Sequence, residues 1–398
     1  MLQDRSVIAL ERANELLADY AAGAPFFFAS PSRTLLAEGA AAVVEQPASD
    51  PAALLVAVGS ALAAADAAGV EAPLAVGAVP FCADAPARLL VPAAVRRAGR
   101  LNFAALESSE AAGPSCAIEP LPHPAEYAAS VEAALARFAA GDLRKVVLSR
   151  ALQLTAPAEI DLAGLVRRLA GRNQQGYTFA VDLPGAGRRT LVGASPELLV
   201  SRTGRHVTAH PLAGSAPRAE DPAEDRRRAM ALLVSAKDLH EHALVAEAVA
   251  DGLRPYCRSV KAPAVPSLVQ TATMWHLASR ITGELDERRA SSLELALALH
   301  PTPAVCGYPT ALARAAIGEL EGFDRGFFTG MVGWCDGRGD GEWAVTIRCA
   351  EVEGRRLRLY AGAGIVPGSS PEAEVAETAA KFGTLLNAMG LNQRAAGA

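Results

Sequence analysis

Four acidic residues of the sequence fall into two pairs whose spacing suits metal binding. Asp238 and Glu241 are three residues apart in a segment expected to be helical, and so are Glu374 and Glu377. Residues at positions i and i+3 share one helix face, so each pair could aim two carboxylates at one point. Mg²⁺ takes such oxygen ligands together with water and an anionic substrate. By spacing alone, a solvated helix face is the commoner explanation.

The tripeptide His240-Glu241-His242 invites a zinc interpretation. Zinc enzymes that use two histidines of one helix space them four residues apart, as in H-E-x-x-H. Histidines two residues apart do not share a helix face. We therefore do not expect zinc here.

Two further residues have the chemistry of a proton-transfer pair. Lys145 begins a strand-like run, and alternation places it on one face with Val147 and Ser149. On an apolar face its ammonium would be desolvated, which lowers the pKa of lysine towards that of a general base. Glu197 follows Pro196 at a strand start, where an apolar pocket would raise the pKa of the carboxyl and make it a proton donor. Taken singly, a lysine at a strand edge and an exposed acid are the commoner explanations.

Two glycine-containing segments, 211–215 and 361–364, could bring the backbone close to an anionic ligand. Glycine has no side chain and lets backbone N–H groups face anionic oxygens. The second segment is not a dinucleotide fingerprint, because its third glycine is missing and no helix is expected to begin there. Arg348 and Lys381 could supply positive charge for substrate carboxylates, although an arginine within a strand could equally face solvent.

A mixture of strands and helices must position these candidates. We expect strands at 73–81, 145–154, 177–183, 190–194, 197–201, 205–209, 267–271, 275–283, 327–335, 342–351 and 355–361. We expect helices at 8–20, 52–67, 125–140, 221–252, 291–299, 309–321 and 372–389. Long strands in adjacent pairs, interrupted by blocks of helix, favour antiparallel sheets over a regular βαβ alternation. The predicted class is α+β, with the C-terminal two-thirds as the core.

Composition narrows the class of protein. The 398 residues are 51% hydrophobic and 20% charged, which excludes a disordered chain, and their net charge of −5 argues against a broad nucleic-acid surface. The N-terminus carries acids that a signal peptide lacks, and the longest near-apolar run, 51–65, is shorter than the roughly 20 residues of a membrane span. Six cysteines without a C-x-x-C pair signal neither a zinc site nor a disulfide framework. We expect a cytoplasmic enzyme with no nucleic-acid or membrane partner.

The motifs become specific when they are taken together and in order. They are KVVLSR, GASPELLV, PLAGSAPR, KDLHEHALV, MWHLASRITGEL, HPTPAVCGYP, GMVGW, WAVTIRC and YAGAGIVPGSSPEAEVAETAAK. This series closely resembles the chorismate-utilising enzymes, and within that family the isochorismate synthases of siderophore and menaquinone pathways. The likeness covers about residues 123–390, whereas 1–120 match more loosely.

The resemblance implies an α+β fold like that of anthranilate synthase component I. Two antiparallel β-sheets would pack face to face with helices outside and the site in a cleft. Residues 1–120 would form a variable N-terminal part of the same fold, 121–392 the chorismate-binding catalytic core, and 393–398 a short tail. The proline-containing segment 112–124 is the best boundary candidate.

The resemblance also implies a role for each matching position. Lys145 corresponds to the base that activates water, and Glu197 to the acid that protonates the departing C4 hydroxyl. The expected Mg²⁺ ligands are Glu241 and Glu377, with Asp238 and Glu374 supporting them directly or through water. The positions expected to contact substrate are Gly214, Ser215, His276, Ala304, Arg348, Gly362, Gly364 and Lys381.

The implied activity is a Mg²⁺-dependent, reversible conversion of chorismate to isochorismate. Salicylate synthases continue by eliminating pyruvate, and they tend to carry threonine at the position of Ala304, so alanine favours isochorismate as the product. Anthranilate and aminodeoxychorismate synthases take ammonia from a glutaminase and generally lack the lysine at position 145; we expect no such subunit. A non-catalytic homologue would lack a proton-transfer or metal residue, and none is missing. We expect a monomer.

Overall fold

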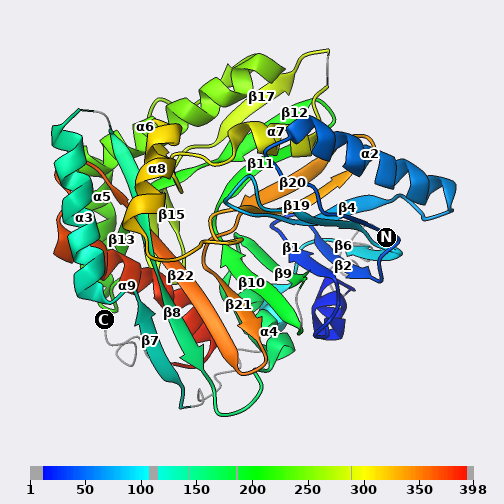
Figure 1. Cartoon of the computed structure of the whole chain (residues 1–398), viewed down its shortest axis with the longest axis horizontal. Coiled ribbons are helices and arrows are strands. Elements are labelled where there is room, and N and C mark those ends of the chain that lie inside the picture. The colour runs from blue at the N-terminus through cyan, green and yellow to red at the C-terminus, as the bar shows by residue number, and fades with distance from the viewer. Residues whose placement is uncertain (1–11, 107–114, 142, 185–186, 288, 392–398) are drawn as a thin grey trace.

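The computed structural model describes residues 12–106, 115–141, 143–184, 187–287 and 289–391, and within these ranges its strands form two large antiparallel sheets and one small one (Figure 1). In spatial order the first sheet contains β18 (Gly307–Tyr308), β8 (Lys145–Thr155), β22 (Arg356–Ile365), β21 (Cys349–Glu353), β10 (Arg189–Ser195), β9 (Tyr177–Leu183), β1 (Phe26–Ala29), β2 (Thr34–Glu38) and β6 (Ala94–Ala98), and β7 (Ala117–Leu121) also pairs with β8. The second contains β14 (Cys257–Lys261), β17 (Ile281–Leu285), β12 (His206–His210), β11 (Leu198–Thr203), β20 (Gly341–Val345), β19 (Met331–Asp336), β4 (Leu74–Val79), β5 (Arg88–Val91) and β3 (Ala42–Val44). The small sheet is β13 (Leu212–Pro217), β16 (Met274–Ala278) and β15 (Ser267–Gln270).

The two large sheets pack face to face around an apolar layer rich in aromatic residues. Successive side chains of a strand point to opposite faces, so Phe26 and Phe28 of β1 enter this layer together with Trp334 of β19. Phe27, between them, points the other way and contacts Tyr20, with ring centroids 5.6 Å apart. The predicted α+β class with two facing antiparallel sheets is confirmed.

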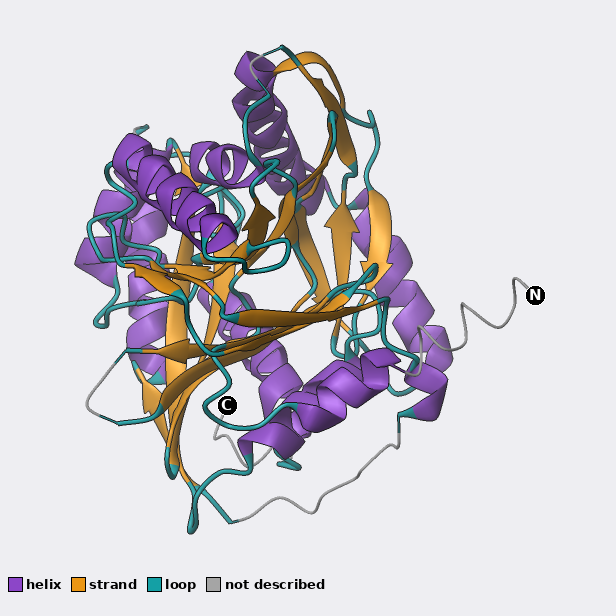
Figure 2. Cartoon of the chain, turned by 90° about the vertical axis from the view of Figure 1, so that its right-hand side faces the viewer, coloured by secondary structure: helices purple, strands orange, loops and turns teal. Residues whose placement is uncertain are grey.

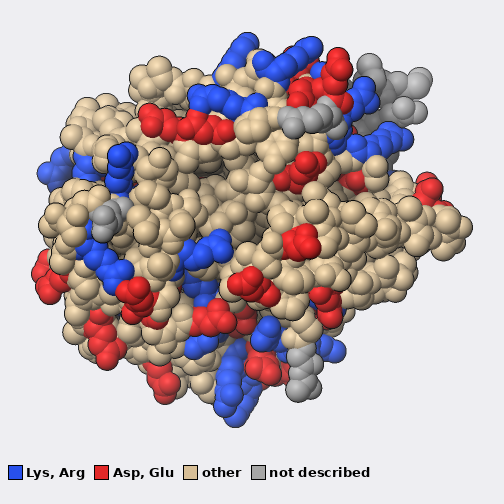
Figure 3. Space-filling model, turned by 45° about the horizontal axis from the view of Figure 1, so that its top comes forward, with Lys and Arg blue, Asp and Glu red and all other residues tan. Residues whose placement is uncertain are grey.

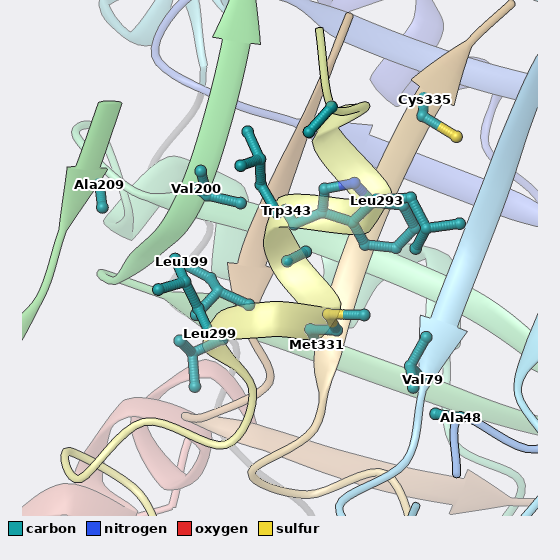
Figure 4. Packing of buried hydrophobic residues seen from close by; sticks show 14 of the residues in the cluster. Ala48, Val79, Leu199, Val200, Ala209, Leu293, Leu299, Met331, Cys335 and Trp343 are labelled. Carbon is teal, nitrogen blue, oxygen red and sulfur yellow. The ribbon is translucent and has the colours of Figure 1, made fainter. Parts of the chain in front are cut away.

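Helices cover the outer faces of both sheets (Figures 1 and 2). The second sheet is covered by α2 (Pro51–Ala67), α6 (Ala236–Leu253) and α7 (Ser292–Leu299). The first sheet carries α4 (Leu162–Arg172), α9 (Pro371–Ala388), α3 (Pro124–Ala139) and α8 (Thr310–Leu320), and the small sheet carries α5 (Pro222–Val234). Residues 12–19 are also helical, and short 3₁₀ turns occupy Phe103–Ala105 and Arg254–Tyr256. In the core below α7, Trp343 of β20 packs in one cluster with Leu293 and Leu299 (Figure 4).

Several expected elements are interrupted. The helix predicted over 221–252 is two helices, α5 and α6, which meet at Ser235. The Ser235 hydroxyl accepts a hydrogen bond from the backbone N–H of Asp238, so this serine caps the second helix rather than continuing the first. The strand predicted over 275–283 is likewise divided between β16 and β17.

Two further breaks place residues with a left-handed backbone beside the strands. The strand expected at 342–351 is interrupted between β20 and β21, where Arg348 has a φ of +50°. The strand expected at 327–335 begins only at Met331, because Thr329 has a φ of +59°. Non-glycine residues adopt such angles rarely, and they are often found at functional sites. Helix α4 was not predicted, although Asp161 caps its first turn.

Strands from both ends of the chain share the two large sheets. β1 pairs with β9, and β4 pairs with β19, so the described strands of the first 120 residues belong to the same sheets as later strands. The division at residue 120 stays a prediction, and the tail at 393–398 lies outside the described residues. Within the described ranges, no helix combines the length and apolar character that a membrane crossing would need. On the face drawn in Figure 3, acidic and basic side chains are interspersed.

Candidate active site

A cavity is lined by the first sheet, the small sheet, helices α6 and α9, and the loops between them. Most of the predicted site residues lie in its wall. They are Glu197, Gly214, Ser215, Glu241, His276, Ala304, Arg348, Gly362, Gly364, Glu377 and Lys381. The other three, Lys145, Asp238 and Glu374, are not part of the lining itself. The structure thus gathers residues that are up to 184 positions apart in the sequence.

Lys145 is the first residue of β8, and its side chain is fully buried. Its Nζ atom lies 2.9 Å from Oε1 of Glu241 on α6. On the neighbouring strand β22, Gly364 leaves the space for this ion pair, because a Cβ atom at that position would collide with the Glu241 carboxylate. The first sheet and α6 are therefore joined at one buried point by a charge pair.

Glu197 lies between β10 and β11 and is 2% exposed. Its Oε1 atom accepts a hydrogen bond from the backbone N–H of Leu212 at 3.4 Å. Burial raises the pKa of this carboxyl to about 7, although the Leu212 N–H and the nearby cations favour the charged form. Near neutral pH the group can therefore hold and release a proton.

Arg348 is buried in the break between β20 and β21, where its left-handed backbone turns the side chain into the cavity wall. One Nη2 hydrogen bond joins it to Nε2 of His276 at 3.2 Å. Burial, and secondly the Arg348 charge, lowers the pKa of His276 well below its usual value, so the neutral ring accepts this bond. Burial also lowers the pKa of Arg348, to about 10, which leaves the guanidinium charged at neutral pH.

Glu377 and Lys381 are one turn apart on α9 and form an ion pair of 2.7 Å. Glu377 also accepts a hydrogen bond from the Ser215 hydroxyl at 2.9 Å, and Lys381 donates to the carbonyl of Gly362 at 2.8 Å. Burial acts to raise the pKa of Glu377, but the Lys381 ammonium and the hydrogen bonds outweigh it and the pKa is lowered. This carboxylate is therefore ionised.

The other two acids, Glu374 and Asp238, lie behind the lining. Glu374 is 1% exposed and pairs with Lys237 of α6 at 2.8 Å. Asp238 is hydrogen-bonded to the Ser235 hydroxyl. Burial raises the pKa of both carboxyls, and nearby carboxylates raise it further, chiefly Glu377 for Glu374 and Glu241 for Asp238. Negative charge is thus concentrated where α6 approaches α9.

Comparison with known proteins decides the family. The profile of a family described as chorismate binding enzyme matches residues 83–390. The chain belongs to the chorismate-binding enzymes. It is 56% identical over 395 residues to the isochorismate synthase DhbC of Bacillus subtilis (strain 168), across 98% of this chain and 99% of that protein. It is 43% identical to the vibriobactin-specific isochorismate synthase of Vibrio cholerae, across 98% of each chain.

A solved structure agrees with this assignment. The structure of a putative 2,3-dihydroxybenzoate-specific isochorismate synthase, DhbC from Bacillus anthracis, superimposes with a TM-score of 0.91 at 50% sequence identity. The match covers 96% of this chain and 100% of that one. This chorismate-binding enzyme therefore shares the fold of that relative over the matched part of the chain.

The acidic side chains at the cavity are of the chemical type that binds a hard divalent cation. Glu241 and Glu377 present carboxylate oxygens to the cavity from two different helices, and both are ionic partners of buried or half-buried lysines. Burial raises the pKa values of Asp238 and Glu374, and so does repulsion from Glu241 and Glu377, which a bound cation would relieve. Within the described ranges, however, no three His, Cys, Asp or Glu side chains are already grouped as metal ligands.

The two histidines beside Glu241 differ in their surroundings. His240 is exposed, whereas His242 is buried and its two ring nitrogens lie 3.2 Å from the carbonyl oxygen of Ala213 and 2.8 Å from the hydroxyl of Ser279. Both ring nitrogens of His242 are thus occupied by structural hydrogen bonds.

Sequence reasoning missed the apolar part of the wall. Phe328 and Tyr360 line the cavity and stack with ring centroids 4.9 Å apart, and Thr329 follows with its left-handed backbone. Val147 and Val305 complete this side. No motif chemistry marks such residues, because apolar side chains of a binding wall look like core residues in a sequence. The alternation along β8, which put Val147 on the face of Lys145, was the one usable signal.

The raised pKa of Glu197 predicts that Glu197→Gln stabilises the protein at high pH only. The folded protein keeps this proton up to about pH 7, whereas the unfolded chain loses it near 4.5, so the buried carboxyl costs stability increasingly as the pH rises through that window. The cost reaches about 3 kcal/mol above pH 7. Thermal unfolding of the ligand-free variant should show a Tm raised by a few degrees at pH 8 and little change at pH 4. A Tm shift that is equal at both pH values would contradict the assignment.

Proposed function

We propose that this chorismate-binding enzyme is an isochorismate synthase. It converts chorismate reversibly to isochorismate by adding water at C2 and removing the hydroxyl at C4. The observation that carries the proposal is the 56% identity, over nearly the whole chain, to the isochorismate synthase DhbC of Bacillus subtilis. The cavity supports it, because Glu197, Glu241 and Glu377 line it and the buried Lys145 is ion-paired with Glu241. The three relatives described above are all named isochorismate synthases, which does not favour a salicylate synthase.

Glu197 and Lys145 would carry the proton transfers. Glu197 lines the cavity and has a pKa of about 7, so near neutral pH it can deliver a proton to the departing C4 hydroxyl. Lys145 would take a proton from the attacking water when its amine is neutral. Proton transfer by positioned groups of this kind contributes about 10²–10⁴-fold each, and either group can act in reverse.

Glu241 and Glu377 would hold Mg²⁺, with Asp238 and Glu374 in support. When bound, the ion would neutralise a carboxylate of the substrate. It would also neutralise the negative charge of Glu241, which otherwise stabilises the ammonium group of Lys145. Glu241 can take part in both effects, because its carboxylate lines the cavity and also pairs with Lys145.

The remaining wall residues would bind and orient the substrate, which is a dianion. The Arg348 guanidinium is buried, charged and held by His276, and it would take the enolpyruvyl carboxylate. Lys381 adds a second positive charge. The other predicted substrate contacts in the wall are Gly214, Ser215, Ala304, Gly362 and Gly364.

The product distinguishes this proposal from its alternatives. With purified protein, chorismate and Mg²⁺, we expect isochorismate in equilibrium with chorismate and only a slow release of pyruvate. Chromatography of the mixture measures the first, and coupling to lactate dehydrogenase measures the second. Pyruvate formed at the rate of chorismate loss would indicate a salicylate synthase instead. An aminated product that depends on ammonium would indicate the anthranilate branch.

Two of the relatives carry pathway words in their names, vibriobactin and 2,3-dihydroxybenzoate. We propose on this basis that the isochorismate made here is consumed on the way to 2,3-dihydroxybenzoate rather than to menaquinone. Neighbouring genes for the next steps would test this. We further propose that the enzyme acts in the cytoplasm as a monomer without a glutaminase subunit, which size-exclusion chromatography with light scattering can check.

A further inference from the structure

Arg325 is a buried cation with no role in the chemistry above. It lies between α8 and β19, is 2% exposed, and uses all five of its N–H donors. Nε and Nη2 donate to the carboxylate of Glu321 at 2.8 and 2.5 Å. Nη1 donates to the carbonyl of Val305 at 2.8 Å and the hydroxyl of Thr329 at 3.1 Å, and Nη2 also donates to the carbonyl of Val147 at 2.8 Å.

Three of these acceptors belong to the wall of the active-site cavity. Val147 is two residues after Lys145 on β8, Val305 follows Ala304, and Thr329 precedes β19. These three segments come from distant parts of the sequence and meet at one guanidinium group. The rigid, planar guanidinium group of Arg325 therefore fixes the distances between these three segments.

Glu321, the ionic partner of Arg325, adds a second attachment to β8. Glu321 is also buried, and its Oε1 atom accepts a hydrogen bond from the backbone N–H of Ser149 at 2.6 Å. Arg325 and Glu321 thus hold β8 at Val147 and Ser149, directly after the residue proposed as the base. The guanidinium also lies over the ring of Phe81, 4.5 Å from its centroid, so it has no freedom to swing away.

We propose that Arg325 is a positioning residue for isochorismate formation, which fixes the strand of Lys145, the segment of Ala304 and Val305, and Thr329 relative to one another. This inference rests on the proposed function. A lysine cannot replace Arg325, because an ammonium group has only three N–H donors at one point and cannot make the five hydrogen bonds of the guanidinium group.

A loosened wall should slow the two reactions of bound isochorismate unequally. The conversion of isochorismate back to chorismate needs Lys145 and Glu197 to be correctly placed relative to the substrate ring. Elimination needs neither, since one hydrogen moves from C2 to the enolpyruvyl methylene carbon while the ether bond at C3 breaks, which gives salicylate and pyruvate with no other reactant. The ratio of pyruvate to chorismate formed from isochorismate therefore reports alignment, and a mere loss of folded protein leaves it unchanged.

The test compares Arg325→Lys with Arg137→Lys, which alters an ion pair with Glu319 at the surface between α3 and α8. For Arg325→Lys we expect kcat for isochorismate formation to fall about 10–100-fold, with a smaller change in KM and a ratio of pyruvate to chorismate raised by a similar factor. The Arg137→Lys control should keep wild-type kcat and ratio. Glu321→Gln, which keeps the shape of the acid but weakens its hold on Arg325, should shift both quantities in the same direction by less, and it serves if Arg325→Lys does not fold.

The outcomes separate this inference from the proposed function. If wild-type protein makes no isochorismate, the proposed function fails. If wild-type protein makes isochorismate but the variants keep its kcat and product ratio per folded molecule, Arg325 is only structural and the inference is overturned. A fall in rate with an unchanged ratio overturns it as well.

Discussion

Replacing Lys145 with alanine is expected to lower kcat by about 10²–10⁴-fold while chorismate still binds. The reason is that Lys145 would act on the transition state as the base that activates water, and it is not part of the cavity lining. Glu197→Gln should show the same pattern, since glutamine keeps the shape of the acid but has no proton to give. Steady-state kinetics by chromatography and chorismate binding by calorimetry measure the two quantities.

Lys261→Ala is the matched control for the lysine variant. Lys261 is exposed at the end of β14 and remote from the cavity lining, so its removal should leave both kcat and KM unchanged. A loss confined to KM in Lys145→Ala or Glu197→Gln would mean that the residue only helps to bind substrate.

Neutralising either of the two carboxylates proposed to hold Mg²⁺ should abolish the dependence on Mg²⁺ together with the activity. Glu241→Gln and Glu377→Gln keep the side-chain shape but remove a charge that a hard cation needs. We expect activity to fall by at least about 100-fold in either variant, and wild-type activity to vanish with EDTA and return with added Mg²⁺. Calorimetric titration with Mg²⁺ gives a reading that is independent of turnover, and both variants should bind the ion more weakly.

Glu247→Gln provides the control on the same helix. Glu247 is exposed on α6, so this variant should bind Mg²⁺ and turn over like the wild type. If wild-type enzyme stays fully active after exhaustive chelation, the proposed requirement for Mg²⁺ is wrong.

The elements around the site could largely be predicted from the sequence, because their signals are local. The strand of Lys145 and the helix of Glu377 have clear periodicity, and the structure has them as β8 and α9. The alternative of a strand-edge lysine does not hold, since β8 pairs with β22 along ten residues and with β18 on the other side. Boundaries failed where a single side chain overrode the pattern, as the Ser235 cap does between α5 and α6.

The proposed roles within the site rest on the ordered motifs, whereas the geometry of the site could not have been predicted from them. No sequence signal tells that Lys145 pairs with Glu241, which is 96 positions later, or that Gly364 makes room for the pair. The left-handed backbone of Thr329 and the five bonds of Arg325 are equally invisible, because they depend on segments that only the folded sheets bring together. Local patterns specify elements, whereas long-range contacts specify the site.

The pairing of β8 with β22 also orders events during protein synthesis. β8 begins at Lys145, and β22, its main partner, begins only at Arg356; α9, which carries Glu377, follows later still. At about 5–20 residues per second, roughly 10–50 seconds pass at the ribosome between the addition of Lys145 and that of Glu377. During that interval β8 has a long, apolar, unpaired edge, which is the kind of surface that chaperones shield and that aggregates when unshielded. A chain released early would therefore have no catalytic function and would be a substrate for quality control.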